Sequence, residues 1–169
     1  MKTLITGGKS AQALKVSKAF AADNLILADY GSIPAFTSAK YQFISLGERN
    51  DTVIAHNLLT HCLDLQVECL VPLYDFELDP LLRSVLLFEE FNIKIFLPER
   101  TVSGEYIKQG GLVHAIAWAV FNESKLIYCS DSELNSRLES LGLERALNGV
   151  FQLENQQDSL VPYLLQIGQ

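Results

Sequence analysis

Cysteine is scarce in this chain, with only Cys62, Cys69 and Cys129 among 169 residues. The number is odd and no pair has the C-x-x-C spacing of a metal or redox motif. A disulfide framework and a zinc site are therefore not predicted, and we expect no bound metal.

Basic residues are also few. Thirteen Lys and Arg face twenty Asp and Glu, for a net charge of −7. Binding to nucleic acid or to an anionic membrane needs a basic patch, because phosphates must be neutralised. No Lys/Arg cluster occurs along the chain, so neither class of partner is predicted.

Long apolar runs are missing as well. The longest run, Leu112–Phe121, contains His114 and is much shorter than the roughly 20 residues of a membrane-spanning helix. The apolar part of the N-terminus is too short for a signal peptide. We therefore expect a cytoplasmic protein.

What the chain does have is a 49% apolar composition, with apolar runs alternating with helical patterns. This alternation predicts an α/β fold: a Rossmann-like, doubly wound, mostly parallel sheet with helices on both faces, in three layers. The expected strands are residues 2–6, 25–28, 41–45, 67–71, 93–97, 125–129 and 150–153. The expected helices are residues 10–22, 52–65, 81–91, 105–121, 134–141 and 158–166.

No repeat or long linker divides the sequence, so residues 1–169 are predicted to form a single domain. Three residues mark expected helix ends. Asp51 is placed to cap one helix, Asp79 followed by Pro80 to start the next, and Gly142 to end a later one.

Ligands of such sheets bind beyond the carboxyl ends of the strands. Three segments are expected to meet there. The turn Gly7, Gly8, Lys9, Ser10 offers backbone N–H groups to an anion, and Asp29 follows the second strand, where a dinucleotide-binding protein keeps an acid. The third segment is Pro72–Glu77, after the fourth apolar strand. In it, Asp75 and Glu77 are candidate acid–base or metal-binding groups. A structural turn, a solvated strand end and a solvated loop explain the three segments equally simply.

The residues from Leu70–Leu82 and Phe88–Pro98 consist of an apolar strand, a proline, a D-x-E-L turn, an apolar helix and a second strand ending in proline. This order resembles the pre-ATP-grasp domain, which precedes the catalytic domains of carbamoyl-phosphate-synthase-like and related carboxylate–amine ligases. Leu4–Lys9 and the strand ending at Asp29 are similar too. The resemblance covers residues 1–98, and it implies that Gly7, Gly8, Lys9, Asp75 and Glu77 are binding positions facing a substrate cleft.

The chain departs from that family after Pro98, because only 71 residues follow. They contain no Gly-rich nucleotide loop and no late pair of acids for magnesium, so residues 99–169 are predicted to be an additional α/β extension. The resemblance then implies a standalone ligand-binding or accessory module without its own ATP-dependent catalysis. It would act as a homodimer or with a separate ATP-grasp partner, as one part of a split ligase, and its small-molecule ligand and any cofactor are not identified.

Two other functions compete with this interpretation. The opening Lys2–Gly8 also resembles sugar-nucleotide epimerases, which predicts a small NAD(P)-binding oxidoreductase or epimerase-like protein. Its glycine pattern is incomplete, and no Tyr-x-x-x-Lys pair occurs. The other alternative is a standalone enzyme that uses Asp75 and Glu77.

Overall fold

A computed structural model of the chain describes residues 1–34, 38–108 and 113–168. It divides into two compact units, Met1–Ile95 with Gln166–Gln169, and Phe96–Leu165. The sequence analysis expected a single domain with an extension after residue 98. Each unit has a sheet of its own, and each is described by itself.

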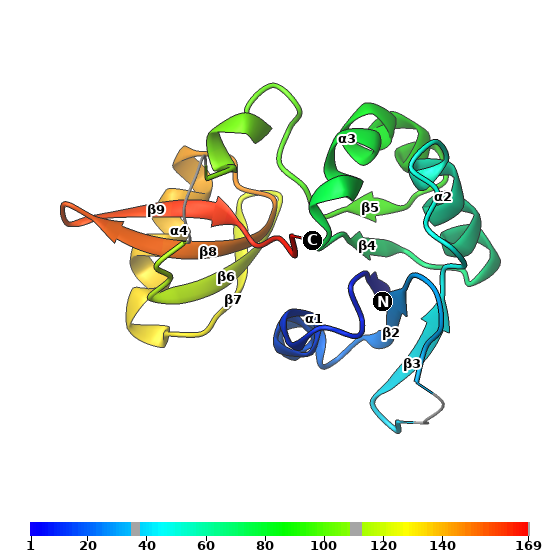
Figure 1. Cartoon of the computed structure of the whole chain (residues 1–169). Helices are drawn as coiled ribbons and strands as arrows, with labels where there is room; N and C mark the ends of the chain where they lie inside the picture. The colour runs from blue at the N-terminus through cyan, green and yellow to red at the C-terminus, as the bar shows by residue number, and fades with distance from the viewer. Residues whose placement is uncertain (35–37, 109–112, 169) are drawn as a thin grey trace. The chain divides into compact units, whose positions relative to one another are not determined.

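The first unit contains a five-stranded parallel sheet (Figure 1). Its order is β3-β2-β1-β4-β5. The strands are β1 (Lys2–Ile5), β2 (Asn24–Asp29), β3 (Tyr41–Ser45), β4 (Cys69–Val71) and β5 (Lys94–Ile95). The helices are α1 (Ala11–Val16), α2 (Ile54–Asp64) and α3 (Asp75–Glu90), and a short 3-10 helix (Ser17–Phe20) continues α1. All five expected strands of this unit are therefore present.

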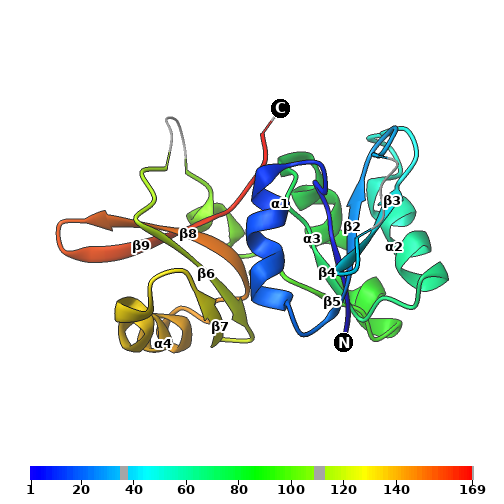
Figure 2. The same cartoon turned by 90° about the horizontal axis from the view of Figure 1, so that it is seen from below.

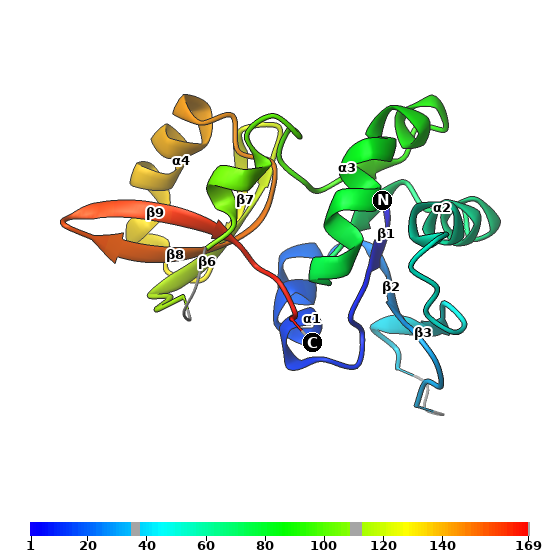
Figure 3. The ribbon, with the colours of Figure 1, turned by 45° about the horizontal axis from the view of Figure 1, so that its top comes forward.

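Helices lie on both sides of strands β1 and β2. α1 lies on one side and α2 on the other (Figures 2 and 3), and α3 packs beside α2. The middle of each central strand is an apolar run: Leu4, Ile5 and Leu27 are fully buried. Strands covered on both faces have this continuous apolar pattern rather than an alternating one.

The start of α3 differs from the prediction. We expected Asp79 and Pro80 to begin this helix, but it begins at Asp75, and Pro80 lies inside it. Pro80 is the sixth residue of α3, beyond the first turn where proline is best tolerated, so the Phe76 carbonyl has no N–H partner four residues later. The D-x-E-L motif is therefore the first turn of a helix and not a loop. Asp51 does not cap α2 either, because its carboxylate pairs with Arg49.

The second unit contains an antiparallel sheet of order β7-β6-β8-β9. Its elements are β6 (Ala117–Asn122), β7 (Lys125–Cys129), α4 (Asn135–Glu144), β8 (Gly149–Gln156) and β9 (Ser159–Leu164), with short 3-10 helices at Ser103–Tyr106 and Ser132–Leu134. The chain is therefore a mixed α/β protein. The expected parallel pairing holds for the first unit and is wrong for the second.

Two predicted helices of the second unit are wrong. Residues 105–121 contain a 3-10 turn and strand β6, while Gly110 and Gly111 of that prediction lie outside the described residues. Buried β6 resembles a buried helix in composition, because its first five residues are all apolar and buried.

Residues 158–166 form β9 instead of a helix. A two-residue turn at Gln157 and Asp158, with φ of 48° and 64°, joins β9 to β8. Two successive positive φ values are typical of a type I′ hairpin turn. Pro162 is accommodated because β9 is an edge strand.

Gly142 does not end α4, as we expected, but lies within it. A Cβ at this position would come within 2.5 Å of the Ser124 carbonyl oxygen and 2.7 Å of the Phe121 ring. The glycine is therefore explained by the close approach of α4 to the sheet.

In the described residues, no helix is long and apolar enough to cross a membrane.

Candidate functional site

The candidate site lies at the carboxyl edge of the parallel sheet in the first unit. The strand order reverses between β1 and β4. The chain runs from β1 to β2 and β3 on one side of β1, and it then returns to form β4 and β5 on the other side. Thr6 and Leu73 follow these two central strands. Loops that diverge from such a point form the usual ligand crevice of an open parallel sheet.

Glu77 is the most enclosed charged group at this edge. Its side chain is fully buried. Its Oε2 accepts hydrogen bonds from the Thr6 hydroxyl at 2.6 Å and from the Tyr74 N–H at 3.3 Å, and its Oε1 accepts one from the Tyr30 hydroxyl at 2.9 Å. Burial raises the pKa of Glu77 to about 7, although these hydrogen bonds favour the ionised form and oppose the rise.

Asp29, at the end of β2, is also buried and fully engaged. Its Oδ1 accepts hydrogen bonds from the Tyr30 N–H at 2.8 Å and the Tyr74 hydroxyl at 2.9 Å. Its Oδ2 accepts one from the Lys9 N–H at 2.8 Å. Both oxygens are therefore used within the protein, whereas a ribose-binding acid needs a free oxygen for a hydroxyl group.

Two tyrosines connect the two acids. Tyr30 donates its hydroxyl to Glu77, and Tyr74 donates its hydroxyl to Asp29. Burial, followed by the effect of the neighbouring carboxylates, raises the pKa of both phenols, so both hydroxyls are protonated donors. We call Thr6, Asp29, Tyr30, Tyr74 and Glu77 the edge network.

The turn after β1 also bonds internally. The N–H of Gly8 donates to the Ala28 carbonyl at 2.9 Å, that of Lys9 to Asp29, and that of Ser10 to the Gly7 carbonyl at 2.8 Å. The Ser10 hydroxyl caps α1 by accepting from the Ala13 N–H. Three successive N–H groups are thus occupied, and a carboxylate lies where an anion would bind. The structural-turn interpretation is favoured over a phosphate cradle.

Lys9 is turned towards the protein as well. Its ammonium donates to the Tyr30 carbonyl at 2.7 Å and lies 3.7 Å from Asp29 Oδ1. The side chain is 41% exposed, so the ion pair remains partly hydrated. Of the predicted site residues, the structure brings Lys9 and Asp29 into direct contact and joins Glu77 to them through the tyrosines.

Asp75 is not part of this network. It lies exposed in the first turn of α3, where it accepts from the Phe76 N–H at 2.7 Å. Glu77, two residues later, faces the core. The two acids therefore lie in different environments, which does not favour an enzyme that uses them as an acid–base pair.

Thr6, Tyr74 and Phe76 lie in the segments expected to converge but were not among the candidate site residues. Tyr30 and Arg49 were not predicted at all. The Tyr74 and Phe76 rings stack with centroids 4.9 Å apart, and the Arg49 guanidinium lies 3.8 Å from the centre of the Phe76 ring. Tyr30 and Tyr74 each stand within a few residues of a strand end, and that position was their only indication in the sequence.

No group of three or more His, Cys, Asp or Glu among the described residues is placed to hold a metal ion.

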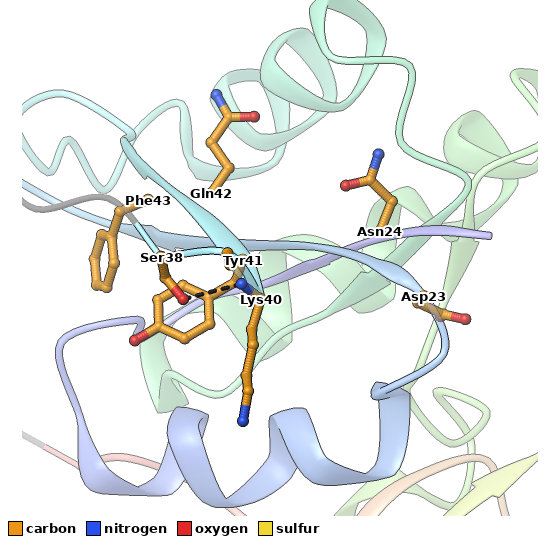
Figure 4. Close-up of a pocket in the computed structure, with 8 residues that line it drawn as sticks. Asp23, Asn24, Ser38, Lys40, Tyr41, Gln42 and Phe43 are labelled. Carbon is orange, nitrogen blue, oxygen red and sulfur yellow. Dashed lines mark hydrogen bonds between the residues drawn. The ribbon is translucent and has the colours of Figure 1, made fainter.

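A surface pocket of about 580 Å³ lies elsewhere in the unit, at β3 and the start of β2 (Figure 4). It contains none of the predicted site residues. Its side chains do not converge, because Gln42 points to the opposite side of β3 from Lys40 and Tyr41 (Figure 4).

No known protein family matches the sequence, and no curated protein matches it significantly.

Proposed function

We propose that this chain is a non-catalytic accessory module, similar to a pre-ATP-grasp domain, that works with a separate ATP-grasp partner. The observation that carries the proposal is the closed edge network. Both buried acids and the turn after β1 bond to one another. Groups engaged in this way hold loops in place and are not available for a reacting substrate.

The architecture of the first unit supports the same function. This unit ends at Ile95, close to residue 98 where the family resemblance ends. Its strand order β3-β2-β1-β4-β5 and its helices on both sides of the central strands are typical of a Rossmann-like, doubly wound domain. The pre-ATP-grasp domain precedes the catalytic domains of its family, so the phosphoryl transfer of a split ligase would come from the partner.

The outer surface of α3 offers a place for a partner to bind. Leu86 is 76% exposed, and Leu87 and Phe91 are 43% and 48% exposed. Apolar side chains clustered near the end of one helix are typical of a surface covered in a complex. We take this surface, rather than the edge network, to be the contact with the partner.

The NAD(P)-binding alternative has less support. A dinucleotide needs free N–H groups at the first turn and a free acid after β2. Here the Lys9 N–H and Asp29 satisfy each other at 2.8 Å. α1 itself is only six residues long, which leaves a weak helix dipole for a pyrophosphate.

The test is reconstitution with an ATP-grasp protein encoded beside this chain. We expect the two proteins to co-elute, and ADP release with carboxylate and amine substrates only when both are present. Leu86→Glu should abolish co-elution. Leu143→Glu, at an equally exposed leucine of the second unit (74%), is the matched control and should not. ADP release by this chain alone, or co-elution insensitive to Leu86→Glu, contradicts the proposal.

A further inference from the structure

The segment Gln166–Gly168 lies against the carboxyl edge of the first unit as an added strand. The Ile167 N–H donates to the Leu73 carbonyl at 2.6 Å, and the Asp75 N–H donates to the Ile167 carbonyl at 3.3 Å. These bonds form a parallel β-bridge between Ile167 and Tyr74. Figures 1, 2 and 3 show the end of the chain beside the first turn of α3.

The Ile167 side chain packs on the Cα of Gly7. A Cβ on Gly7 would meet the terminal methyl Cδ1 of Ile167 and would lie 3.8 Å from the Leu73 Cβ. Gly7 also has a φ of +69°, which disfavours other residues. The positive φ therefore accounts for glycine at this position, and an aliphatic side chain packs on its Cα.

This contact occupies the point where the strand order reverses, between β1 and β4. Its polar part is backbone alone: one C=O and one N–H on the protein, one N–H and one C=O on the segment. The apolar part is a single branched side chain. Recognition by backbone pairing with a pocket for one side chain is how sheet edges bind extended peptides.

The segment Gln166–Gly168 is more exposed than the residues of the first unit that it contacts. Leu73 is 1% exposed and Gly7 is buried, whereas Ile167 is half-buried and Gly168 is exposed. A segment with two backbone bonds and one buried contact is among the parts of a protein that open at low free-energy cost.

We propose that Gly7, Leu73 and Asp75 form a peptide-binding slot, which takes an extended segment with a branched aliphatic residue. In this structure the chain's own Ile167 fills it. The slot binds a segment of the same chemistry from another molecule when Ile167 leaves. This site is independent of the α3 surface and of the partner inferred above.

The experiment uses the full chain with Ile167→Gly, labelled with ¹⁵N, and a synthetic peptide of residues 163–168. We expect saturable shifts of the Gly7 and Asp75 amide resonances. The same peptide carrying Ile167→Pro is the matched control. Proline cannot donate to the Leu73 carbonyl, so its binding should be at least about tenfold weaker.

The unaltered chain supplies the second measurement. Its own segment competes at an effective concentration in the millimolar range, on the order of that for short linkers. The peptide should therefore bind it several-fold more weakly than it binds the Ile167→Gly chain. Ile167→Ala keeps part of the side-chain contact and should lie between the two, which keeps the test decisive if Ile167→Gly disturbs the fold.

Three outcomes overturn the proposal: no peptide-dependent shifts in either variant, equal shifts with the Ile167→Pro peptide, or shifts confined to residues outside the slot. Each would mean that the Ile167 contact is a structural attachment of this segment alone. Failure of this experiment leaves the co-elution test untouched, because that test depends on Leu86.

Discussion

Glu77 in α3 and Thr6 after β1 are 71 positions apart in the sequence and are joined by a hydrogen bond of 2.6 Å. The same Thr6 oxygen accepts from the Leu73 N–H at 2.8 Å. One hydroxyl therefore ties together the ends of two neighbouring strands and the first turn of a helix. The stability of this edge depends on a buried carboxylate that accepts hydrogen bonds from two hydroxyl groups and one backbone N–H.

The first prediction concerns pH. Burial raises the pKa of Glu77 from its ordinary value of 4.5 to about 7 in the folded chain. Because the folded-state pKa is the higher one, the folded chain binds the proton more tightly. Its unfolding free energy therefore falls as the pH rises from 4.5 to 7. The loss is on the order of 2–3 kcal/mol.

Urea denaturation at several pH values checks this, with Glu77→Gln as the comparison. The amide stays neutral and can donate to the Tyr30 oxygen, as a protonated Glu77 does. The variant should lose most of the pH dependence over this window. Parallel pH profiles for the two proteins would mean that Glu77 does not titrate there.

The second prediction concerns Thr6. Thr6→Val keeps the shape of the side chain, but it leaves the buried Leu73 N–H without its acceptor and Glu77 without one donor. We expect a destabilisation of about 2 kcal/mol and a further rise in the pKa of Glu77. Thr60→Val is the control, since Thr60 is exposed on α2, where its hydroxyl donates to the His56 carbonyl.

Denaturation of both variants measures the difference. An equal effect at Thr60 would show that the loss comes from the threonine-to-valine change itself and not from the edge network.

The third prediction compares two glycines of the second unit. In an ordinary helix interior, Gly→Ala stabilises by roughly 0.5–1 kcal/mol. Gly142→Ala should instead destabilise by about 1–3 kcal/mol, because its Cβ would lie 2.5 Å from a backbone oxygen. Gly104→Ala meets nothing within 4 Å and should be neutral. A stabilising Gly142→Ala would contradict the close approach of α4 to β6.

The fourth prediction concerns the N-cap of α1. Ser10→Ala removes the acceptor of the Ala13 N–H and should cost about 1 kcal/mol. Ser140→Ala, at an exposed position inside α4, should change stability by less than about 0.5 kcal/mol. Thermal unfolding of both variants measures the difference in stability. An unchanged stability of Ser10→Ala would mean that the Ser10 hydroxyl does not stabilise α1 as an N-cap.

The sequence predicted the first unit well, because its local patterns and its tertiary structure agree. Lys2–Ile5 and Tyr41–Ser45 are compact apolar or alternating runs, and both are strands in the positions expected. The second unit was predicted poorly. Ala117–Asn122 is buried on both faces, so it has no alternation that would separate a strand from a helix.

The candidate site was predicted in part. Position after a strand was enough to select Lys9 and Asp29, which do meet. Local sequence could not show that Glu77 bonds Tyr30, 47 positions away, or that Ile167 packs on Gly7. Such contacts depend on which strands are neighbours, and that is a property of the whole sheet.

The closed edge network can be tested most directly by thermal unfolding with about 5 mM ATP·Mg²⁺ and, separately, about 5 mM NAD⁺. A ligand with a Kd near 0.1 mM would add about 2 kcal/mol at that concentration and raise the Tm by several degrees. The account predicts no rise with either ligand, because Asp29, Glu77 and the Lys9 N–H are already bonded within the protein. A saturable rise with ATP or NAD⁺ that disappears in Asp29→Asn would show that these groups do bind a nucleotide, and it would contradict the account.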